Sequence, residues 1–202
     1  PKPSDYPKIK ASLLLILKKI SFSHLKPKQW YYLLVCISKI DNMDKILTSE
    51  ALIRFSDCDP MGHLNNMRYL DYFLNAREDQ LKQYAGFDIY QHIKKTGQIW
   101  VMFQNKITYL KPVFYNHTVL ISSRIIGMSK KSIKVEMQMK DAGTGDLKCV
   151  LWMIAVYFDT LRNQSAEHQP EIEAMLQQYL SPVVQQTFDE RVKYLQEKYR
   201  TN

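Results

Sequence analysis

The chain has 202 residues, of which 28 are Lys or Arg and 20 are Asp or Glu, giving a formal net charge of +8. Residues 1–42 hold eight lysines against Asp5 and Asp41, so most of the excess charge lies there and the remaining 160 residues carry only +2. A nearly neutral body excludes the basic surface typical of nucleic-acid-binding proteins.

Residues 1–42 also differ from the rest of the chain in pattern. Their two short apolar runs fall well below the roughly 20 residues that cross a bilayer, so no membrane span is predicted. A signal peptide is disfavoured, because no small-residue cleavage site follows cleanly, and Met43 would be an ordinary start. We expect residues 1–42 to be a non-native or disordered extension, residues 43–165 to form the main domain, and residues 166–202 to form a C-terminal helical extension.

The three cysteines, Cys36, Cys58 and Cys149, are scattered and odd in number. No Cys/His cluster has the spacing of a metal site, so neither a metal nor another cofactor is predicted. We interpret the cysteines as reduced thiols of a cytoplasmic protein.

A short strand and a long helix are the first elements predicted after Met43. The strand covers residues 50–56. From residue 64 to residue 84 apolar side chains recur at helical spacing on a wide stripe, which predicts a helix that is wrapped on most sides. Gly86 is a plausible stop, and a shorter helix at 88–95 would end at Gly97.

Four strand-like segments follow. They cover residues 99–109, 119–125, 133–139 and 147–158. The first three alternate apolar and polar residues, whereas the last is apolar on both faces and should be a central strand. A glycine-containing turn at 141–146 joins the last two. The predicted order is one strand, one long helix and an antiparallel meander of four strands.

The C-terminal stretch 170–200 has two apolar stripes at helical spacing. Pro182 follows Ser181 between them, and proline interrupts helices. The stretch therefore predicts one or two amphipathic helices that pack on the domain or on a partner subunit.

The segment 54–77 carries most of the functional information and reads RFSDCDPMGHLNNMRYLDYFLNAR. Two aspartates flank a cysteine at the end of the first strand, and a tight turn, two asparagines and the long helix follow. A carboxylate is thereby placed beside a helix start, where free N–H groups and the helix dipole favour developing negative charge. Acyl transfer needs this pairing of a base or nucleophile with an oxyanion site.

Asp57-Cys58-Asp59-Pro60-x-Gly62, followed by a tyrosine-bearing helix and several strands, resembles the hot-dog-fold acyl-CoA thioesterases, and most closely their 4-hydroxybenzoyl-CoA thioesterase-like group. The resemblance covers roughly residues 50–158. It implies an α+β hot-dog fold in which a five-stranded antiparallel sheet wraps a long central helix. It also implies an acyl-CoA substrate and a homodimer or homotetramer with the active site between subunits.

The resemblance places the catalytic carboxylate at Asp59, which would act as nucleophile or general base, and the polarising backbone amide at Asn66. His63 is the third catalytic candidate, because an Asp-x-x-x-His spacing matches the related acyl-carrier-protein thioesterases. Those enzymes carry Asn two residues after the Asp, where this chain has Met61, which argues against a papain-like triad. For Asp57 we prefer a structural role in the turn at the strand end.

The remaining candidates would bind substrate. Asn65 would cap the helix start. Gly62 would either allow a close approach of ligand to the turn or simply supply the positive φ that the turn needs. Tyr69 would line the acyl tunnel or simply pack. Lys130 and Lys131 resemble the basic stretch that binds the nucleotide phosphates of CoA in this group.

The predicted function is hydrolysis of a fatty or aromatic acyl-CoA to free acid and CoA. An acyl-carrier-protein thioesterase and a non-catalytic acyl-CoA-binding subunit are the alternatives. A hot-dog hydratase is disfavoured, because its usual Asn-Pro-x-His context is missing.

Overall fold

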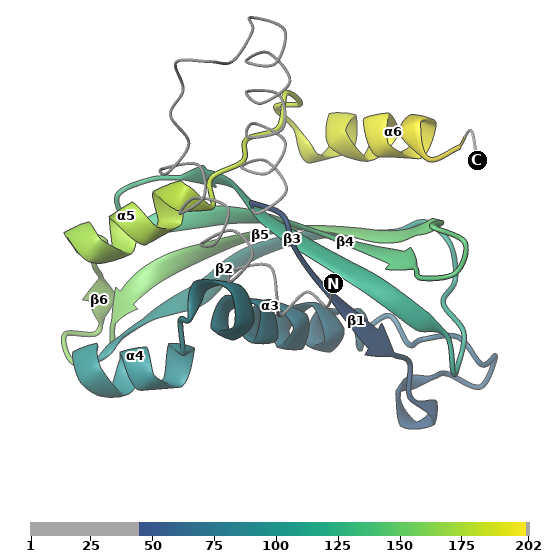
Figure 1. The fold of residues 1–202 in the computed structure, drawn as a ribbon, viewed down its shortest axis with the longest axis horizontal. Helices are drawn as coiled ribbons and strands as arrows, with labels where there is room; N and C mark the ends of the chain where they lie inside the picture. Colours follow the sequence, from purple (N-terminus) through teal and green to yellow (C-terminus); the bar gives the residue numbers. More distant parts are fainter. Residues whose placement is uncertain (1–44, 201–202) are drawn as a thin grey trace, which may run out of the picture.

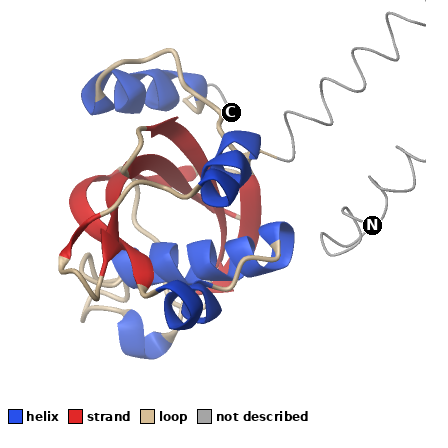
Figure 2. Cartoon of the chain, turned by 90° about the vertical axis from the view of Figure 1, so that its left-hand side faces the viewer, coloured by secondary structure: helices blue, strands red, loops and turns tan. Residues whose placement is uncertain are grey.

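A curled antiparallel sheet packs around one long helix (Figures 1 and 2). The computed structural model describes residues 45–200, so the segment 1–42 lies outside the described residues. The strands are β1 (Leu47–Leu52), β2 (Gln98–Tyr109), β3 (Thr118–Met128), β4 (Ser132–Asp141), β5 (Leu147–Asp159) and β6 (Gln164–Ser165). The helices are a single 3-10 turn at Phe55–Asp57, then α3 (Tyr69–Ala85), α4 (Ile89–Thr96), α5 (Pro170–Gln178) and α6 (Phe188–Lys198).

The strand order corrects one prediction. The order in the sheet is β1-β3-β4-β5-β2, with the two-residue β6 added beside β5. The predicted meander of four is therefore wrong: β2 pairs with β5, for example Ile107 with Leu151, and not with β3. The alternation of apolar and polar residues shows which side chains share a face of the sheet, but it does not show which strands are hydrogen-bonded neighbours. The connection at 110–117 carries the chain to the opposite part of the sheet, whereas β5 lies in the interior, as predicted.

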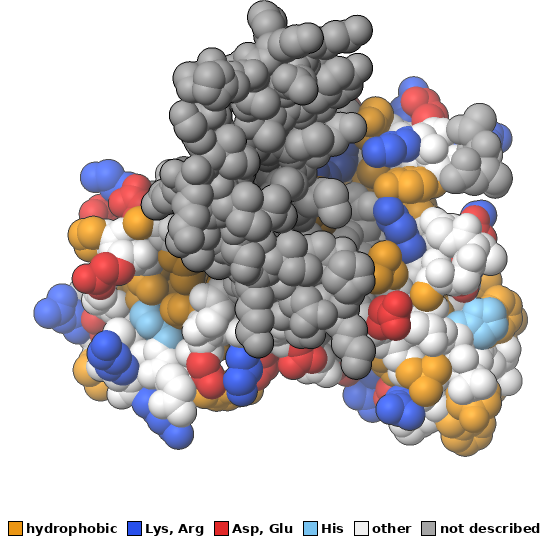
Figure 3. Space-filling view, in the orientation of Figure 1, with side chains coloured by type: hydrophobic (Ala, Val, Ile, Leu, Met, Phe, Trp, Pro, Cys, Tyr) orange, Lys and Arg blue, Asp and Glu red, His pale blue; other side chains and the backbone are white. Residues whose placement is uncertain are grey.

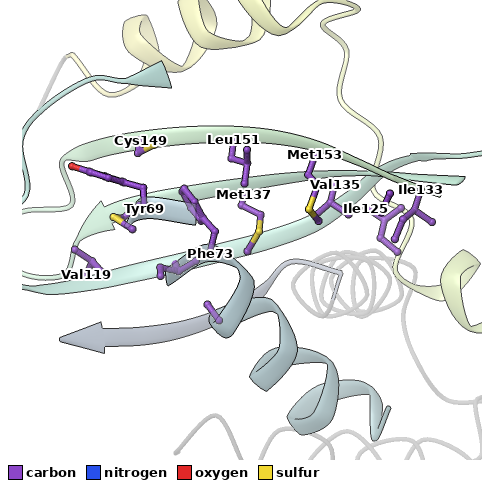
Figure 4. Close-up of a cluster of buried hydrophobic side chains, with 14 of the residues drawn as sticks. Tyr69, Phe73, Val119, Ile125, Ile133, Val135, Met137, Cys149, Leu151 and Met153 are labelled. Carbon is purple, nitrogen blue, oxygen red and sulfur yellow. The ribbon is translucent and has the colours of Figure 1, made fainter. Parts of the chain in front are cut away.

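The two faces of the sheet are covered differently. Helix α3 packs on one face and helix α6 over the other, as the end-on view shows (Figure 2). The larger core lies between α3, α5 and the sheet, and Figure 4 shows Phe73 directed at Met137 and its neighbours. The smaller core joins α6 to β5, with Phe188 against Trp152 at 5.6 Å between ring centroids. The boundary expected at residue 166 stays a prediction, although α5 shares the main core.

Helix α3 begins later than predicted and is buried along one stripe. Residues 64–68 are not helical, because Leu64 pairs with Cys58 and its N–H donates to the Val113 carbonyl. The buried side chains are Tyr69, Phe73, Ala76, Arg77 and Gln80, whereas the opposite face is exposed. The sheet does wrap the helix, but the described residues do not cover it on most sides.

The glycine stops and the C-terminal helices agree with the sequence. Gly86 and Gly97 both end their helices in the left-handed conformation, with φ of 62° and 71°. Two helices, α5 and α6, lie on either side of the Ser181–Pro182 break, and a capping box of Thr187 and Glu190 starts the second. Within residues 45–200, no helix has the length and apolar character that a membrane crossing requires.

A buried carboxylate fastens α6 to the sheet. Glu136 of β4 is 1% exposed and accepts hydrogen bonds from Arg191 of α6, Arg124 of β3 and the Trp152 indole N–H. Burial alone would raise the pKa of Glu136, but the bonds from Arg191 and the charge of Arg124 outweigh it and lower the pKa to about 2.

The lowered pKa of Glu136 predicts a loss of stability in acid. A carboxyl with a depressed folded-state pKa stabilises fully above its ordinary value of 4.5, and this contribution disappears as the pH falls from there towards 2. At about 1.4 kcal/mol per pH unit, the loss should be about 3 kcal/mol. Urea unfolding across this pH range measures it, and a Glu136→Gln variant should lose much less over the same interval. An equal loss in the variant would contradict the assignment.

Candidate active site

The Asp-Pro-Met-Gly segment forms a closed turn at one end of the sheet. The Asp59 N–H donates to the His63 carbonyl at 2.8 Å, and the Gly62 N–H donates to the Asp59 carbonyl at 2.9 Å. Pro60 fits the second position of such a turn because its φ is already fixed, and Gly62 supplies the φ of +77° that closes it. Gly62 is thus required by the backbone, while contact with substrate stays a prediction.

The carboxylate of Asp59 is held by one oxygen only. Its Oδ1 accepts the backbone N–H groups of Met61 at 2.9 Å and His63 at 3.1 Å. Across residues 45–200, Oδ2 has neither a hydrogen bond nor an ion pair. The side chain is half-buried, so the turn fixes its orientation and leaves the second oxygen for water or a reacting carbonyl.

The two asparagines lie beside this turn. The Cys58–Leu64 pairing and a 2.9 Å bond from the Asn65 N–H to the Asp57 carbonyl hold the segments on either side of it together. Asn65 Oδ1 caps the turn before α3 by accepting the Met67 N–H at 2.9 Å. The Asn66 N–H has no hydrogen-bond partner within the described chain, and the residue is exposed. This amide is a free donor at the entrance to the helix.

The side chain of Asp57 contacts residues at the start of α3, and the structural role that we prefer for it stays a prediction. Its Oδ2 accepts the Tyr72 hydroxyl at 2.8 Å, and its Oδ1 lies 3.8 Å from Arg68 Nε. Cys58, between the two aspartates, is a poor alternative nucleophile, because burial and the two neighbouring carboxylates raise the pKa of its thiol. Of the three adjacent side chains, Asp59 is the one with a free reactive atom.

The structure does not bring the His63 ring to the Asp59 carboxylate. The contact between the two residues is through the His63 backbone, while the imidazole packs edge-on against Phe114 with ring centroids 4.8 Å apart. Tyr69 is buried in the main core against Tyr109, and burial raises the pKa of its hydroxyl to about 12. Tyr69 therefore packs in the core of this structure, and a proton-handling role for His63 stays a prediction.

Lys130 and Lys131 lie far from the Asp59 turn. They are exposed in the β3–β4 hairpin, whose carbonyls accept the N–H groups of His168 and Tyr157. The Asp59 turn is attached at the other end of β3 through the His63–Phe114 pairing. Eleven residues of strand at about 3.3 Å each separate the two ends by roughly 35 Å. A single copy of the chain cannot use both for the same thioester group.

Two features of the site were missed in the sequence. The Tyr109 hydroxyl donates to the Asn66 carbonyl at 2.9 Å, which ties β2 to the residues before α3. Exposed apolar side chains also surround the turn: Phe55, Met61, Met67 and Tyr115. In Figure 3, hydrophobic side chains are exposed at the lower right of the molecule as well as elsewhere on this face. Such a rim is suited to an acyl group or to a second subunit, and no local pattern indicates it because the residues come from separate segments.

The family model for the thioesterase-like superfamily matches residues 53–176, which includes the turn, α3, the β2–β5 strands and most of α5. The chain therefore belongs to the thioesterase-like superfamily. It is a thioester hydrolase with the hot-dog fold, as predicted.

Several solved structures are similar to this chain in fold. A 1,4-dihydroxy-2-naphthoyl-CoA thioesterase from Synechocystis has a TM-score of 0.60 at 14% identity, covering 65% of this chain and 95% of its own. The 12:0-ACP thioesterase from Umbellularia californica gives 0.63 at 14%, covering 72% and 54%. The protein SAV2348 from Staphylococcus aureus, solved in complex with CoA, gives 0.64 at 11%, covering 72% and 91%. A search of curated protein sequences found no match.

Proposed function

We propose that this protein hydrolyses a fatty or aromatic acyl-CoA to the free acid and CoA, with Asp59 as nucleophile or general base. The observation that carries the proposal is the carboxylate of Asp59, which is anchored through Oδ1 and has no partner at Oδ2 among residues 45–200. A catalytic base or nucleophile must be held in one orientation and must not be neutralised by an ion pair. The turn holds the Asp59 carboxylate in this way.

The two candidate mechanisms differ in their first step. Asp59 Oδ2 either attacks the thioester carbonyl to form an anhydride that water then opens, or takes a proton from a water that attacks directly. In both, the carbonyl oxygen gains negative charge and the Asn66 N–H, free of any partner within residues 45–200, would donate to it. The thiolate of CoA then leaves, and it needs little help from an acid.

A homodimer is part of the proposal, because β2 is an edge strand of the sheet formed by residues 45–200. It pairs with β5 on one side, and its exposed residues include Val101 and Phe103, which is 76% exposed. A long apolar edge strand is a template for pairing with another chain. A second subunit is also the only source of Lys130 and Lys131 within reach of a CoA bound at Asp59, given their separation in one protomer. A tetramer stays an alternative.

Phe103→Lys should separate the dimer. Placing an ammonium group in a buried strand-to-strand contact should raise the dimer dissociation constant at least about tenfold. Light scattering after size exclusion, at several concentrations, measures this. Tyr90→Lys is the matched control, because Tyr90 is 61% exposed but belongs to α4 and not to the strand. A wild-type chain that is monomeric at high concentration would reject the proposal.

CoA is our choice of carrier, since SAV2348 is a structural neighbour solved with CoA. The carrier-protein alternative draws support from the similar fold of the 12:0-ACP thioesterase. We also place the protein in the cytoplasm, because Cys58 and Cys149 are free thiols.

A thiol-release assay over matched acyl-CoA and acyl-carrier-protein substrates tests the proposal. We expect turnover with acyl-CoA to exceed that with the carrier protein carrying the same chain. Calorimetric binding of a non-hydrolysable acyl-CoA should accompany it. Binding without thiol release would show a non-catalytic acyl-CoA binder instead.

A further inference from the structure

A cavity lies between α3, α5 and the sheet, away from the Asp59 turn. Its volume is about 290 Å³, near the lower end of the range for small-molecule sites. The lining is mostly apolar and includes Leu81 of α3, Trp100 and Met102 of β2, Met153 of β5 and Met175 of α5. Flexible methionine side chains and an aromatic ring suit an apolar chain of variable shape.

One buried cation lines this apolar cavity. Arg77 of α3 is 6% exposed, and its Nη1 donates to Ser123 Oγ at 3.0 Å. No carboxylate lies within ion-pair distance of it among residues 45–200, and the neighbouring Glu78, the other charged residue of the lining, makes no ion pair either. A buried guanidinium without a counter-ion is costly, and it retains donors for an anion.

We propose that this cavity binds a small amphipathic carboxylate such as a free fatty acid, with the carboxylate on Arg77 and the tail among the methionines and Trp100. A carboxylate matches the single charge and the planar donors of one guanidinium. A phosphate dianion would leave a second negative charge without a partner in the same apolar surroundings.

The ligand would be separate from the thioester that reacts at Asp59. Arg77 follows Tyr69 by eight positions in α3, which is about 12 Å along the helix axis. The interior between the two ends is filled by Phe73, Met137 and Leu151, which are fully buried. Figure 4 shows Tyr69 and Cys149 at one end of this row and Val135, Ile133 and Met153 at the other. No acyl chain passes through this packed row, so the cavity takes a second molecule.

Calorimetric titration with octanoate and with octanol tests the proposal on the full chain. The wild type should bind octanoate at least about tenfold more tightly than octanol. Arg77→Met should remove this preference and keep octanol binding. It should fold, because it removes an unpaired buried charge and Ser123 still donates to Gln80. Arg77→Lys, which keeps the charge, should bind octanoate with intermediate affinity, and Glu78→Gln is the matched control that should keep wild-type preference.

The same titration on Asp59→Asn separates this site from the proposed catalytic one. Octanoate affinity should be unchanged there, whatever happens to thioester turnover. The proposal would be overturned if the wild type did not bind octanoate. It would also be overturned if Arg77→Met bound octanoate as tightly as the wild type, or if Asp59→Asn lost octanoate binding.

Discussion

Asp59→Asn should lower thioester turnover by about 100-fold to 10,000-fold while leaving the fold intact. The amide oxygen of Asn can still accept the Met61 and His63 N–H groups that hold the turn, so the backbone geometry is preserved. What disappears is the negative charge at the unpaired oxygen, which is needed for attack or for proton abstraction. General-base catalysis alone contributes a factor of this size. Steady-state release of free thiol from an acyl-CoA measures the change.

The thermal midpoint of Asp59→Asn serves as its folding control. A turn that keeps both hydrogen bonds should unfold at nearly the wild-type temperature. Near-normal turnover in a folded variant would reject Asp59 as the reacting group and return attention to His63, whose ring would then have to approach the substrate from its place beside Phe114.

Glu136→Ala should destabilise the protein by about 3–5 kcal/mol. The variant leaves Arg124 and Arg191 facing each other without their shared carboxylate, and it also removes the acceptor of the Trp152 N–H. Truncating one member of a buried charge network typically costs this much, chiefly because the partners remain buried. Since Arg191 belongs to α6, loss of this helix from the sheet should be the first event. Urea unfolding gives the free energy, and hydrogen exchange gives the location.

Lys111→Ala is the comparison for Glu136→Ala. Lys111 Nζ lies only 2.7 Å from Asp146 Oδ1, but the pair is exposed, so its removal should have a far smaller effect. Similar losses of unfolding free energy in the two variants would show that burial does not make the Glu136 network more stabilising than an exposed ion pair.

Local signals account for the parts of the fold that were predicted correctly. Gly86 and Gly97 stop helices because they occupy the left-handed conformation, and the apolar run of β5 reflects burial on both faces. The partner of β2 could not be predicted, because pairing with β5 depends on where the chain travels between residues 109 and 118. The late start of α3 has the same origin: Leu64 is apolar at helical spacing, but its N–H is taken by Val113.

In the candidate site, too, local arrangements could be predicted from the sequence and contacts between distant residues could not. Asp59, Pro60 and Gly62 form one short turn, so their arrangement could be anticipated from sequence. The contacts of Tyr109 with Asn66 and of Tyr72 with Asp57 join residues distant along the chain, and no pattern indicates them. Lys130 and Lys131 were grouped with Asp59 by resemblance, yet the length of β3 places them at the other end of the protomer.

The most direct measurement of the central claim is the turnover number of Asp59→Asn beside that of Asp57→Asn on one acyl-CoA. The two aspartates are separated by a single cysteine. Within the described part of the chain Asp59 has an unpaired oxygen, while Asp57 is engaged by Tyr72 and Arg68. We predict that Asp57→Asn stays within a few-fold of the wild type and that Asp59→Asn falls by at least about 100-fold. Equal losses in both variants, or a larger loss in Asp57→Asn, would contradict the account.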